Sequence, residues 1–228
     1  MRYELRHPFM EVEGEGKTTY GGSQRRGRLD HMRRWGCGVI GAADLLFYLS
    51  LYHPRYRAGL FADAPRDGRV TLDWYNDRID QLRRRFLPVI PHHGINGLAL
   101  AFGLNLYFKK YKLPLRARWG VRPGRLWDEI DAQLRKDMPV IFSIGNNFPR
   151  MWQKNKLGFY PAPDREGCKP AARTMAHYVT VTGSDAEWLR ISSWGVEYYI
   201  SKAEYCAYVD QYSSNILSNM LYIREIEE

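Results

Sequence analysis

The spacing of hydrophobic and polar positions changes character near residue 138, and the two sides of that point predict different kinds of structure. Before it, apolar residues recur at helical spacing. The stretch that begins near Cys37 is apolar nearly all round and is closed by His53-Pro54, which predicts a buried helix. Three more helices are predicted on the same grounds, at 72–87, at 94–111 and after Pro123. Asp73 is expected to cap the first of these.

After residue 138 the apolar runs are short, rich in β-branched and aromatic residues, and separated by glycine-containing turns. Such runs predict strands, and five are expected: 138–144, 176–182, 188–193, 196–200 and 217–223. Ser201 and Glu204 match a capping box that opens a short helix. Residues 148–174 are expected to be irregular. Helices that precede strands in this segregated order indicate an α+β fold.

The first 35 residues are polar, basic and rich in glycine. We expect an extended lead-in that packs on the core through Tyr3, Phe9 and Tyr20. The length of 228 residues suits one large domain or two small ones. Hydrophobic residues make up 45% of the chain and charged residues 26%, which excludes a disordered, collagen-like or coiled-coil protein.

The chain has three cysteines, Cys37, Cys168 and Cys206, and no CxxC pair. Three cysteines are too few, and odd in number, for a disulfide framework, and without a CxxC pair a structural zinc site is not expected. We therefore expect a protein of a reducing compartment that carries no metal or other cofactor. Cys168 is expected to be exposed and Cys206 to lie in the core. No secretory apolar run and no window long enough for a membrane span are found, so the predicted location is cytoplasmic.

Lysine and arginine exceed aspartate and glutamate by nine charges, which favours acidic partners. A nucleic-acid-binding protein is one hypothesis, and the less favoured one. Five arginines stand shortly before Cys37: Arg25, Arg26, Arg28, Arg33 and Arg34. They predict a solvated face or, if they frame a cleft, a positive potential that favours a thiolate and an acidic substrate.

Trp35-Gly36-Cys37-Gly38 places a cysteine at the first turn of the predicted buried helix. The positive end of the helix dipole and the unpaired N–H groups there stabilise a thiolate, and the same N–H groups can bind an oxyanion. The flanking glycines leave room for a substrate backbone. A small buried core cysteine is the alternative interpretation of this position.

Ala176-His177-Tyr178 opens a predicted strand, and a histidine held at a strand end is well placed to act as a general base near neutral pH. A structural histidine is the alternative. One hairpin later, Arg190 to Gly195 should form the neighbouring strand, and a side chain there is expected to hold the imidazole in position, with Trp194 covering the contact.

This order of motifs resembles the papain-like cysteine peptidases, most nearly the bacterial peptidases related to those that process double-glycine bacteriocin leaders. The likeness covers about residues 20–205. It rests on Cys37-Gly38 at the start of an Ala- and Leu-rich helix, on the His177 strand, and on Ser192-Ser193-Trp194-Gly195. It implies a single domain over 1–228, with a helical lobe at about 36–137, a β-rich lobe at about 138–228 that takes in part of the lead-in, and the active-site cleft between them.

The resemblance implies Cys37 as nucleophile, His177 as general base and Ser192 at the place of the orienting Asn or Asp. A neutral hydroxyl stabilises imidazolium less than a carboxylate does. The papain pattern puts its oxyanion glutamine about six residues before the cysteine, where this chain has His31. Gln24 is the nearest upstream glutamine and the preferred candidate, with His31 in reserve.

The first hypothesis is therefore a thiol hydrolase, a cysteine peptidase that cleaves a peptide or amide bond through an acyl-enzyme on Cys37. An acyltransferase on the same fold is a close chemical alternative. The second hypothesis is a papain-fold binding protein whose triad has decayed at Ser192. The expected partner is a peptide or amide substrate, acidic if the arginines frame the cleft, and neither nucleic acid nor a membrane.

Overall fold

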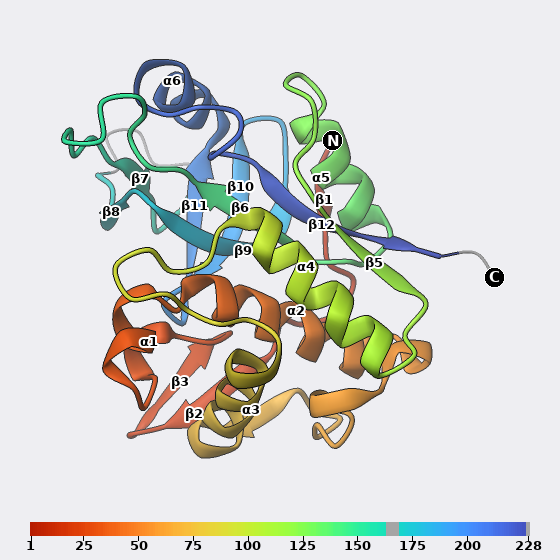
Figure 1. The fold of residues 1–228 in the computed structure, drawn as a ribbon. Helices are drawn as coiled ribbons and strands as arrows, with labels where there is room; N and C mark the ends of the chain where they lie inside the picture. Colours follow the sequence, from red (N-terminus) through yellow and green to blue (C-terminus); the bar gives the residue numbers. More distant parts are fainter. Residues whose placement is uncertain (163–168, 227–228) are drawn as a thin grey trace.

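The computed structural model describes residues 1–162 and 169–226, and its centre is a helix packed against a large antiparallel sheet (Figure 1). Seven strands form the sheet, in the order β11-β10-β9-β6-β12-β5, with β1 beside β9. All its pairings are antiparallel. The strands are β1 Tyr3–Glu4, β5 Leu115–Trp119, β6 Val140–Ile144, β9 His177–Ser184, β10 Trp188–Ser193, β11 Val196–Ser201 and β12 Met220–Glu225.

Helices and two smaller sheets surround this unit. The helices are α1 Asp30–Trp35, α2 Cys37–Tyr52, α3 Leu72–Arg85, α4 Gly97–Lys110, α5 Leu126–Arg135 and α6 Lys202–Tyr212. The smaller sheets are β3-β2-β4 (Lys17–Tyr20, Glu11–Gly14 and Arg69–Thr71) and β7-β8 (Leu157–Phe159 and Ala172–Thr174). In Figure 1, α1, α3 and the strands β2 and β3 lie below α2, on the side away from the large sheet.

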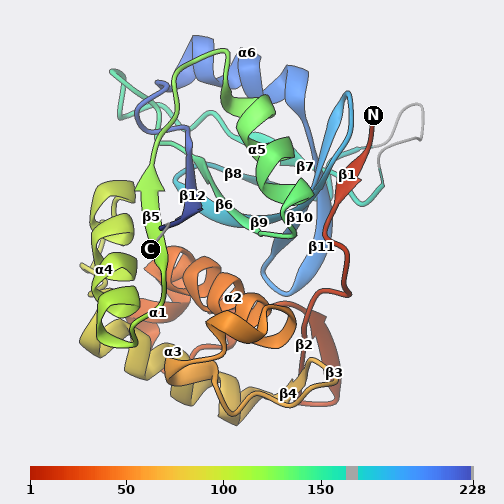
Figure 2. The ribbon, with the colours of Figure 1, turned by 90° about the vertical axis from the view of Figure 1, so that its right-hand side faces the viewer.

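Successive residues of the central strand β6 face different helices. Ile141 lies against Gly41 of α2, whereas the ring of Phe142 contacts Trp127 of α5 and Tyr205 of α6. Because neighbouring side chains of a strand point to opposite faces, α2 covers one face of the sheet, and α5 and α6 cover the other. Figure 2 shows the same layers, with α2 below the sheet and α5 and α6 above it.

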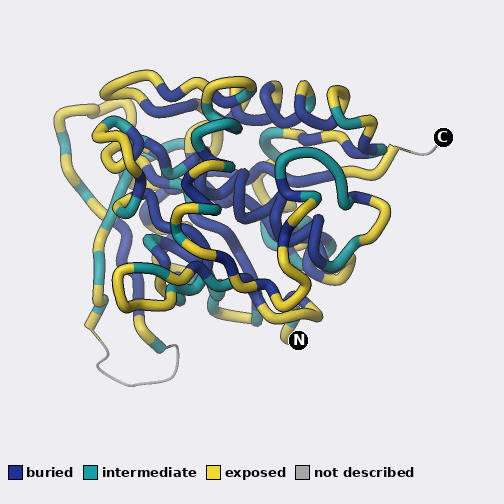
Figure 3. The backbone as a smooth tube through the Cα atoms, turned by 90° about the horizontal axis from the view of Figure 1, so that it is seen from below, coloured by how far each residue is buried: buried dark blue, intermediate teal, exposed yellow. Residues whose placement is uncertain are grey.

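Helix α2 lies in the middle of the core. All fourteen residues from Gly38 to Leu51 are buried, as expected of a helix that is apolar nearly all round. One of them, Asp44, is charged in its ordinary state, and it is only 1% exposed. Figure 3 shows the buried residues as a continuous interior with the exposed stretches around it.

The elements with the strongest hydrophobic patterns were predicted correctly. The buried helix, the strand β6 and the β9-β10-β11 meander are all present, and β10 has the predicted bounds. Ser201 caps α6 by accepting the N–H of Glu204. The predicted cap of the 72–87 helix was wrong, because the hydroxyl of Thr71, rather than Asp73, accepts the N–H of Trp74.

The predicted division at residue 137 does not match the sheet. β5, which lies within the range assigned to the helical lobe, pairs with β12, and α5 packs on the large sheet. The lead-in contains the extended strands β1, β2 and β3, and it also contains the helix α1, which was not predicted. These strands are short and carry many polar residues, so they lack the alternation that identifies a strand in the sequence.

The two other cysteines lie away from the core. Cys206 is exposed on α6, so its predicted place in the core was wrong, and Cys168 lies outside the described residues. Within residues 1–162 and 169–226, every helix is too short or too polar to cross a membrane.

Candidate active site

Cys37 is the first residue of α2 and follows directly on the end of α1. Gly36 is the C-cap of α1 and the N-cap of α2, and the backbone N–H groups of Cys37 and Gly38 oppose the rise in the pKa of the thiol. A Cβ at Gly38 would lie 2.6 Å from a methyl carbon of Ile95, so the helix start requires glycine there. Cys37 as a residue is partly buried and partly exposed.

His177 is the first residue of β9 and pairs in register with residue 144 of β6. The residue before it, Ala176, has a φ of +51°, so the chain turns sharply into the strand. His177 is 6% exposed, and its ring stacks on Trp194 with the centroids 4.6 Å apart. The turn and the stacked indole together fix the orientation of the imidazole.

The side chain that contacts His177 is Ser193, one residue beyond the position assigned to this role from the sequence. Ser193 Oγ lies 2.8 Å from Nε2 of His177, whereas Ser192 Oγ donates to the carbonyl oxygen of Tyr20 at 2.7 Å. Neighbouring residues on a strand face opposite sides, so a shift of one residue exchanges the two hydroxyls. The placement of Ser192 against the imidazole was therefore wrong.

Cys37 and His177 line the same small cavity, together with Gln24, Tyr178 and Trp194. The backbone N–H of Tyr178, the residue after His177, also donates to the Cys37 thiol. The start of β9 thus lies against the start of α2. This is the juxtaposition that the sequence motifs predicted for the nucleophile and the base.

Burial sets the protonation of both groups. It raises the pKa of the Cys37 thiol, against the opposing hydrogen bonds from the N–H groups of Tyr178, Gly38 and Cys37. Burial first, and then the positive charge of Arg25, lower the pKa of His177 to about 3. At neutral pH the site therefore rests as a neutral thiol beside a neutral imidazole rather than as an ion pair.

Gln24, rather than His31, lies at the site. Gln24 opens the 3₁₀ turn η1 (Gln24–Arg26), is buried, and lines the cavity with Cys37. Its Nε2 donates to the carbonyl oxygens of Arg33 at 3.1 Å and Arg34 at 3.3 Å. His31 lies on α1 and is not among the residues that line the cavity.

Four of the five arginines near Cys37 make contacts away from the cavity. Arg26 donates to the Gly14 carbonyl and pairs with Glu15, Arg28 pairs with Asp73 and Asp77, and Arg33 and Arg34 pair with Asp30. Arg25 is the exception. Its guanidinium carbon lies 4.4 Å from the centre of the Trp194 ring, the ring that stacks on His177. The expected cluster of cleft arginines is therefore reduced to one residue.

Asp44 is a site residue that the sequence analysis missed. It lines the cavity with Cys37, and its Oδ1 accepts the hydroxyl of Tyr75 at 2.6 Å and the N–H of Gly22 at 3.0 Å. Burial raises its pKa to about 7, and those two hydrogen bonds oppose the rise. The signal was present in the sequence, because a carboxyl inside a helix that is otherwise apolar must have buried partners.

A second cavity of about 230 Å³ adjoins His177. Its lining includes the apolar side chains of Ile95, Leu98, Trp119, Ile144, Ile216 and Leu217, and has no Asp, Glu, Lys or Arg among its described residues. Its walls come from the start of α4, the end of β6 and the start of β9. The space beside the imidazole is thus uncharged, although the protein carries a net charge of +9.

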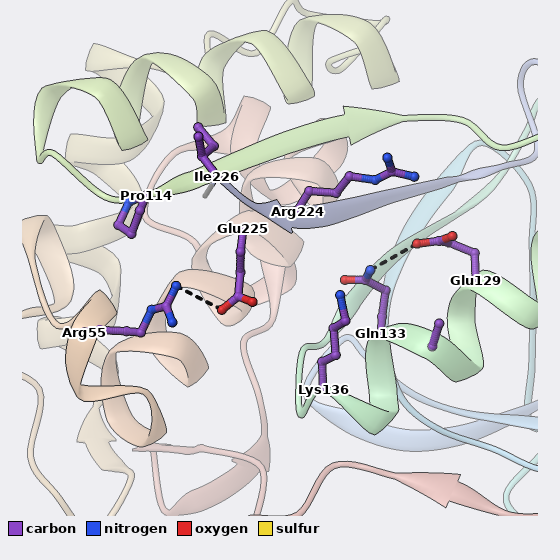
Figure 4. A pocket seen from close by; sticks show the side chains of 9 residues that line it. Arg55, Pro114, Glu129, Gln133, Lys136, Arg224, Glu225 and Ile226 are labelled. Carbon is purple, nitrogen blue, oxygen red and sulfur yellow. Dashed lines mark hydrogen bonds and ion pairs between the residues drawn. The ribbon is translucent and has the colours of Figure 1, made fainter. Parts of the chain in front are cut away.

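A hollow of about 840 Å³ lies elsewhere, between α5, the end of β12 and the turn after α2 (Figure 4). Charged side chains line it, and several pair with one another. Arg55 contacts Glu225 at 3.1 Å, and Gln133 donates to Glu129 at 3.2 Å. Neither Cys37 nor His177 lines it, so it is separate from the candidate active site. Across the described part of the chain, no three His, Cys, Asp or Glu side chains are grouped as a metal site.

We compared the chain with protein families, curated proteins and solved structures. No family model and no curated protein matches the sequence. Among solved structures, a candidate C39-like peptidase from Bacillus anthracis matches with a TM-score of 0.51 and 12% identity, over the whole of both chains. The chain therefore shares its overall fold with that structure.

Proposed function

We propose that this protein is a thiol hydrolase that cleaves a peptide or amide bond, with Cys37 as nucleophile and His177 as general base. The observation that carries the proposal is the meeting of a helix-start cysteine and a strand-start histidine at one cavity, with Nε2 of the histidine held by Ser193. The likeness over the full chain to a candidate C39-like peptidase supports the same class.

In the proposed reaction the thiol proton moves to Nδ1 of His177, because Nε2 is engaged by Ser193. The sulfur attacks the substrate carbonyl, a C–S bond forms, and the carbonyl oxygen takes the negative charge. His177 then gives its proton to the amine as the C–N bond breaks. Water, deprotonated by His177, next attacks the thioester, the C–S bond breaks, and the acid leaves as the thiol is restored.

The proposed oxyanion donors are the backbone N–H of Cys37 and the side-chain amide of Gln24. The amide lies at the cavity with its hydrogens directed at the Arg33 and Arg34 carbonyls. Oxyanion binding requires one of these hydrogens to be redirected toward the substrate. In the resting structure the Gln24 amide is therefore close to the cavity, but its hydrogens do not point at the place of the oxyanion.

Two features favour a second candidate, a papain-fold protein that binds a peptide without turning it over. Ser193 is neutral and stabilises imidazolium less than a carboxylate would, and the lowered pKa of His177 disfavours the ion pair. An acyltransferase would use the same acyl-enzyme and differ in the acceptor, an amine in place of water.

The uncharged cavity beside His177 supports a substrate with an apolar side chain next to the scissile bond. Among the described residues, no Lys or Arg lines it to form an ion pair with a carboxylate, and an unpaired buried charge is costly. Arg25 is the only one of the five arginines that remains for an acidic group, on the Trp194 side of the site. We therefore propose a neutral, apolar residue in the cavity beside His177 in place of the acidic substrate suggested by net charge.

The test uses p-nitrophenyl acetate, an activated ester that acylates thiols and releases a coloured nitrophenolate. With Cys168 and Cys206 replaced by serine, the protein should give a burst of nitrophenolate close to one per molecule, followed by slower turnover. Cys37→Ala should abolish the burst and His177→Ala should slow it at least about a hundredfold. A burst that is unchanged in His177→Ala would reject the proposed base.

Faster turnover when a small amine is added would point to the acyltransferase. Absence of any burst that depends on Cys37 would favour the binding protein. A folded Cys37→Ala variant, checked by its circular dichroism and melting temperature, serves as the matched blank for both measurements.

A further inference from the structure

The segment that carries Gln24 is tied to the helix that carries Cys37. Two residues before Gln24, the N–H of Gly22 donates to both carboxyl oxygens of Asp44, at 3.0 and 3.3 Å. Asp44 lies seven residues after Cys37 on α2. Two turns of an α-helix take about seven residues, so the two side chains lie on the same side of the helix. The nucleophile and the anchor of the oxyanion segment thus share one rigid element.

Asp44 is held from a second direction by α3. The hydroxyl of Tyr75 donates to Oδ1 of Asp44 at 2.6 Å, and Tyr75 is itself buried, with 1% exposure. A carboxyl in the interior is costly unless donors surround it. Asp44 lines the cavity and accepts one hydrogen bond from Tyr75 of α3 and one from Gly22 of the segment. Its carboxyl therefore links α3 to the Gly22–Gln24 segment.

The approach of the segment to these groups is tight. Gly21 has a φ of +73°, in the left-handed region that favours glycine. A Cβ at Gly22 would lie 2.0 Å from the Tyr75 hydroxyl. The backbone at Gly21-Gly22 can reach Asp44 only because neither residue has a side chain.

Ser192 fastens the same segment from the sheet. Its hydroxyl donates to the carbonyl oxygen of Tyr20 at 2.7 Å, and the N–H of Gly21 donates to the carbonyl oxygen of Met10 at 2.9 Å. The serine that sequence analysis assigned to the imidazole thus holds the chain that leads to Gln24.

We propose that Asp44 is a positioning residue that fixes the Gly22–Gln24 segment beside Cys37 and so aligns the oxyanion donors with the nucleophile. The role rests on the proposed function. It does not require Asp44 to touch substrate. Loss of Asp44 should slow the reaction step that forms an oxyanion and should leave the rate of thiol alkylation unchanged.

Asparagine can keep only part of this arrangement. Oδ1 of Asp44 accepts both the Tyr75 hydroxyl and the Gly22 N–H, and Oδ2 also accepts the Gly22 N–H at 3.3 Å. An Asn amide presents one oxygen and two N–H groups, so with its oxygen at the Oδ1 position it sets an NH₂ group against the Gly22 N–H. Tyr75→Phe removes one donor and leaves the Gly22 contact, so it should have a smaller effect in the same direction.

The test compares two reactions of Cys37. Acylation by p-nitrophenyl acetate passes through a tetrahedral oxyanion, while alkylation by iodoacetamide displaces iodide and forms none. Asp44→Asn should slow acylation about tenfold to a hundredfold, since loss of an oxyanion donor costs about a hundredfold or more. It should change alkylation by less than about twofold. Ser192→Ala, which loosens the same segment from the other side, should also slow acylation alone.

Asp137→Asn is the matched control. Asp137 is also a buried carboxyl with 2% exposure, and it accepts the hydroxyl of Tyr48 at 2.6 Å and the N–H of Arg6 at 2.7 Å. It does not line the cavity of Cys37. Its replacement should leave the ratio of acylation to alkylation unchanged, whatever it does to stability.

Equal loss of both reactions in Asp44→Asn, or an unchanged acylation rate in both Asp44→Asn and Ser192→Ala, would overturn the role of Asp44 and leave the proposed function intact. Failure of the unaltered protein to acylate at Cys37 would overturn the proposed function, and this role with it. If Asp44→Asn does not fold, Tyr75→Phe and Ser192→Ala decide the question by the same ratio.

Discussion

The hydroxyl oxygen of Ser193 lies 2.8 Å from Nε2 of His177. The contact can fix the ring, but it places no negative charge beside it. The contact with Ser193 orients the imidazole, and burial lowers its pKa to about 3. The ring of His177 is therefore well oriented and only weakly basic.

Ser193→Asp should convert the resting pair toward an ion pair. A carboxylate beside the imidazole raises its pKa, by about one to three units for a close opposite charge, and a protonated ring in turn stabilises the Cys37 thiolate. Since the pKa of His177 is about 3, the ring should then titrate between about pH 4 and 6, and alkylation of Cys37 by iodoacetamide should rise in that range. Ser192→Ala, whose side chain does not touch the ring, should leave the pH profile of alkylation as it was. No gain in Ser193→Asp would contradict the assignment of Ser193.

The pH dependence of Cys37 alkylation should be that of a raised thiol pKa. Burial raises the pKa above its ordinary 9.0, so the thiolate fraction at pH 7 is small and grows about tenfold per unit of pH up to and beyond pH 9. The measurement follows iodoacetamide labelling in a protein whose other two cysteines are replaced by serine. A plateau of high reactivity between pH 5 and 8 would instead show a preformed thiolate–imidazolium pair.

Arg25→Gln should raise the pKa of His177. The guanidinium lies over Trp194, and its positive charge disfavours a second positive charge on the imidazole. An NMR titration of the ring protons of His177 should move to higher pH in this variant. Arg34→Gln is the control, because Arg34 pairs with Asp30 at 3.0 Å on the exposed side of α1. An unchanged or lower pKa in Arg25→Gln would remove Arg25 from the electrostatics of the site.

Asp44 should make the protein less stable as pH rises from 4 to 7. Its pKa is about 7 in the folded protein and ordinarily 3.8, so in this window the folded state holds a proton that the unfolded state has lost, and stability falls with pH. The contribution amounts to about 3 kcal/mol across the window, at 1.36 kcal/mol per unit. Urea unfolding of wild type and Asp44→Asn should give free energies whose difference changes by this order between pH 4 and 7. A constant difference would contradict the raised pKa.

The sequence was sufficient where the hydrophobic pattern was strong. Helix α2 and the strands β6 and β9 to β11 were predicted because their apolar residues repeat over many positions, and both Cys37 and His177 stand at their ends. Strand β5 was missed because only Leu115 and Ala117 face the interior among alternating arginines, a signal too short to separate from a loop.

The site required information that periodicity does not contain. Whether Ser192 or Ser193 faces the imidazole depends on strand register, and β9 and β10 shift register between Arg190 and Ile191. A shift of this kind exchanges the two faces of a strand, and it cannot be predicted from the local sequence. Gln24 lines the cavity with Cys37 although twelve residues stand between them in the sequence, and α1 occupies part of that interval.

The central claim is that Cys37 becomes acylated with the help of His177, and peptide mapping of the acetylated protein tests it most directly. Brief treatment of the unaltered protein with p-nitrophenyl acetate near neutral pH is followed by digestion and mass spectrometry, with the exposed Cys206 as the reference thiol in the same molecule. We predict that the acetyl group is found on Cys37 first, and that His177→Ala abolishes this preference. Acetylation that favours Cys206, or a preference for Cys37 that survives in His177→Ala, would contradict the account.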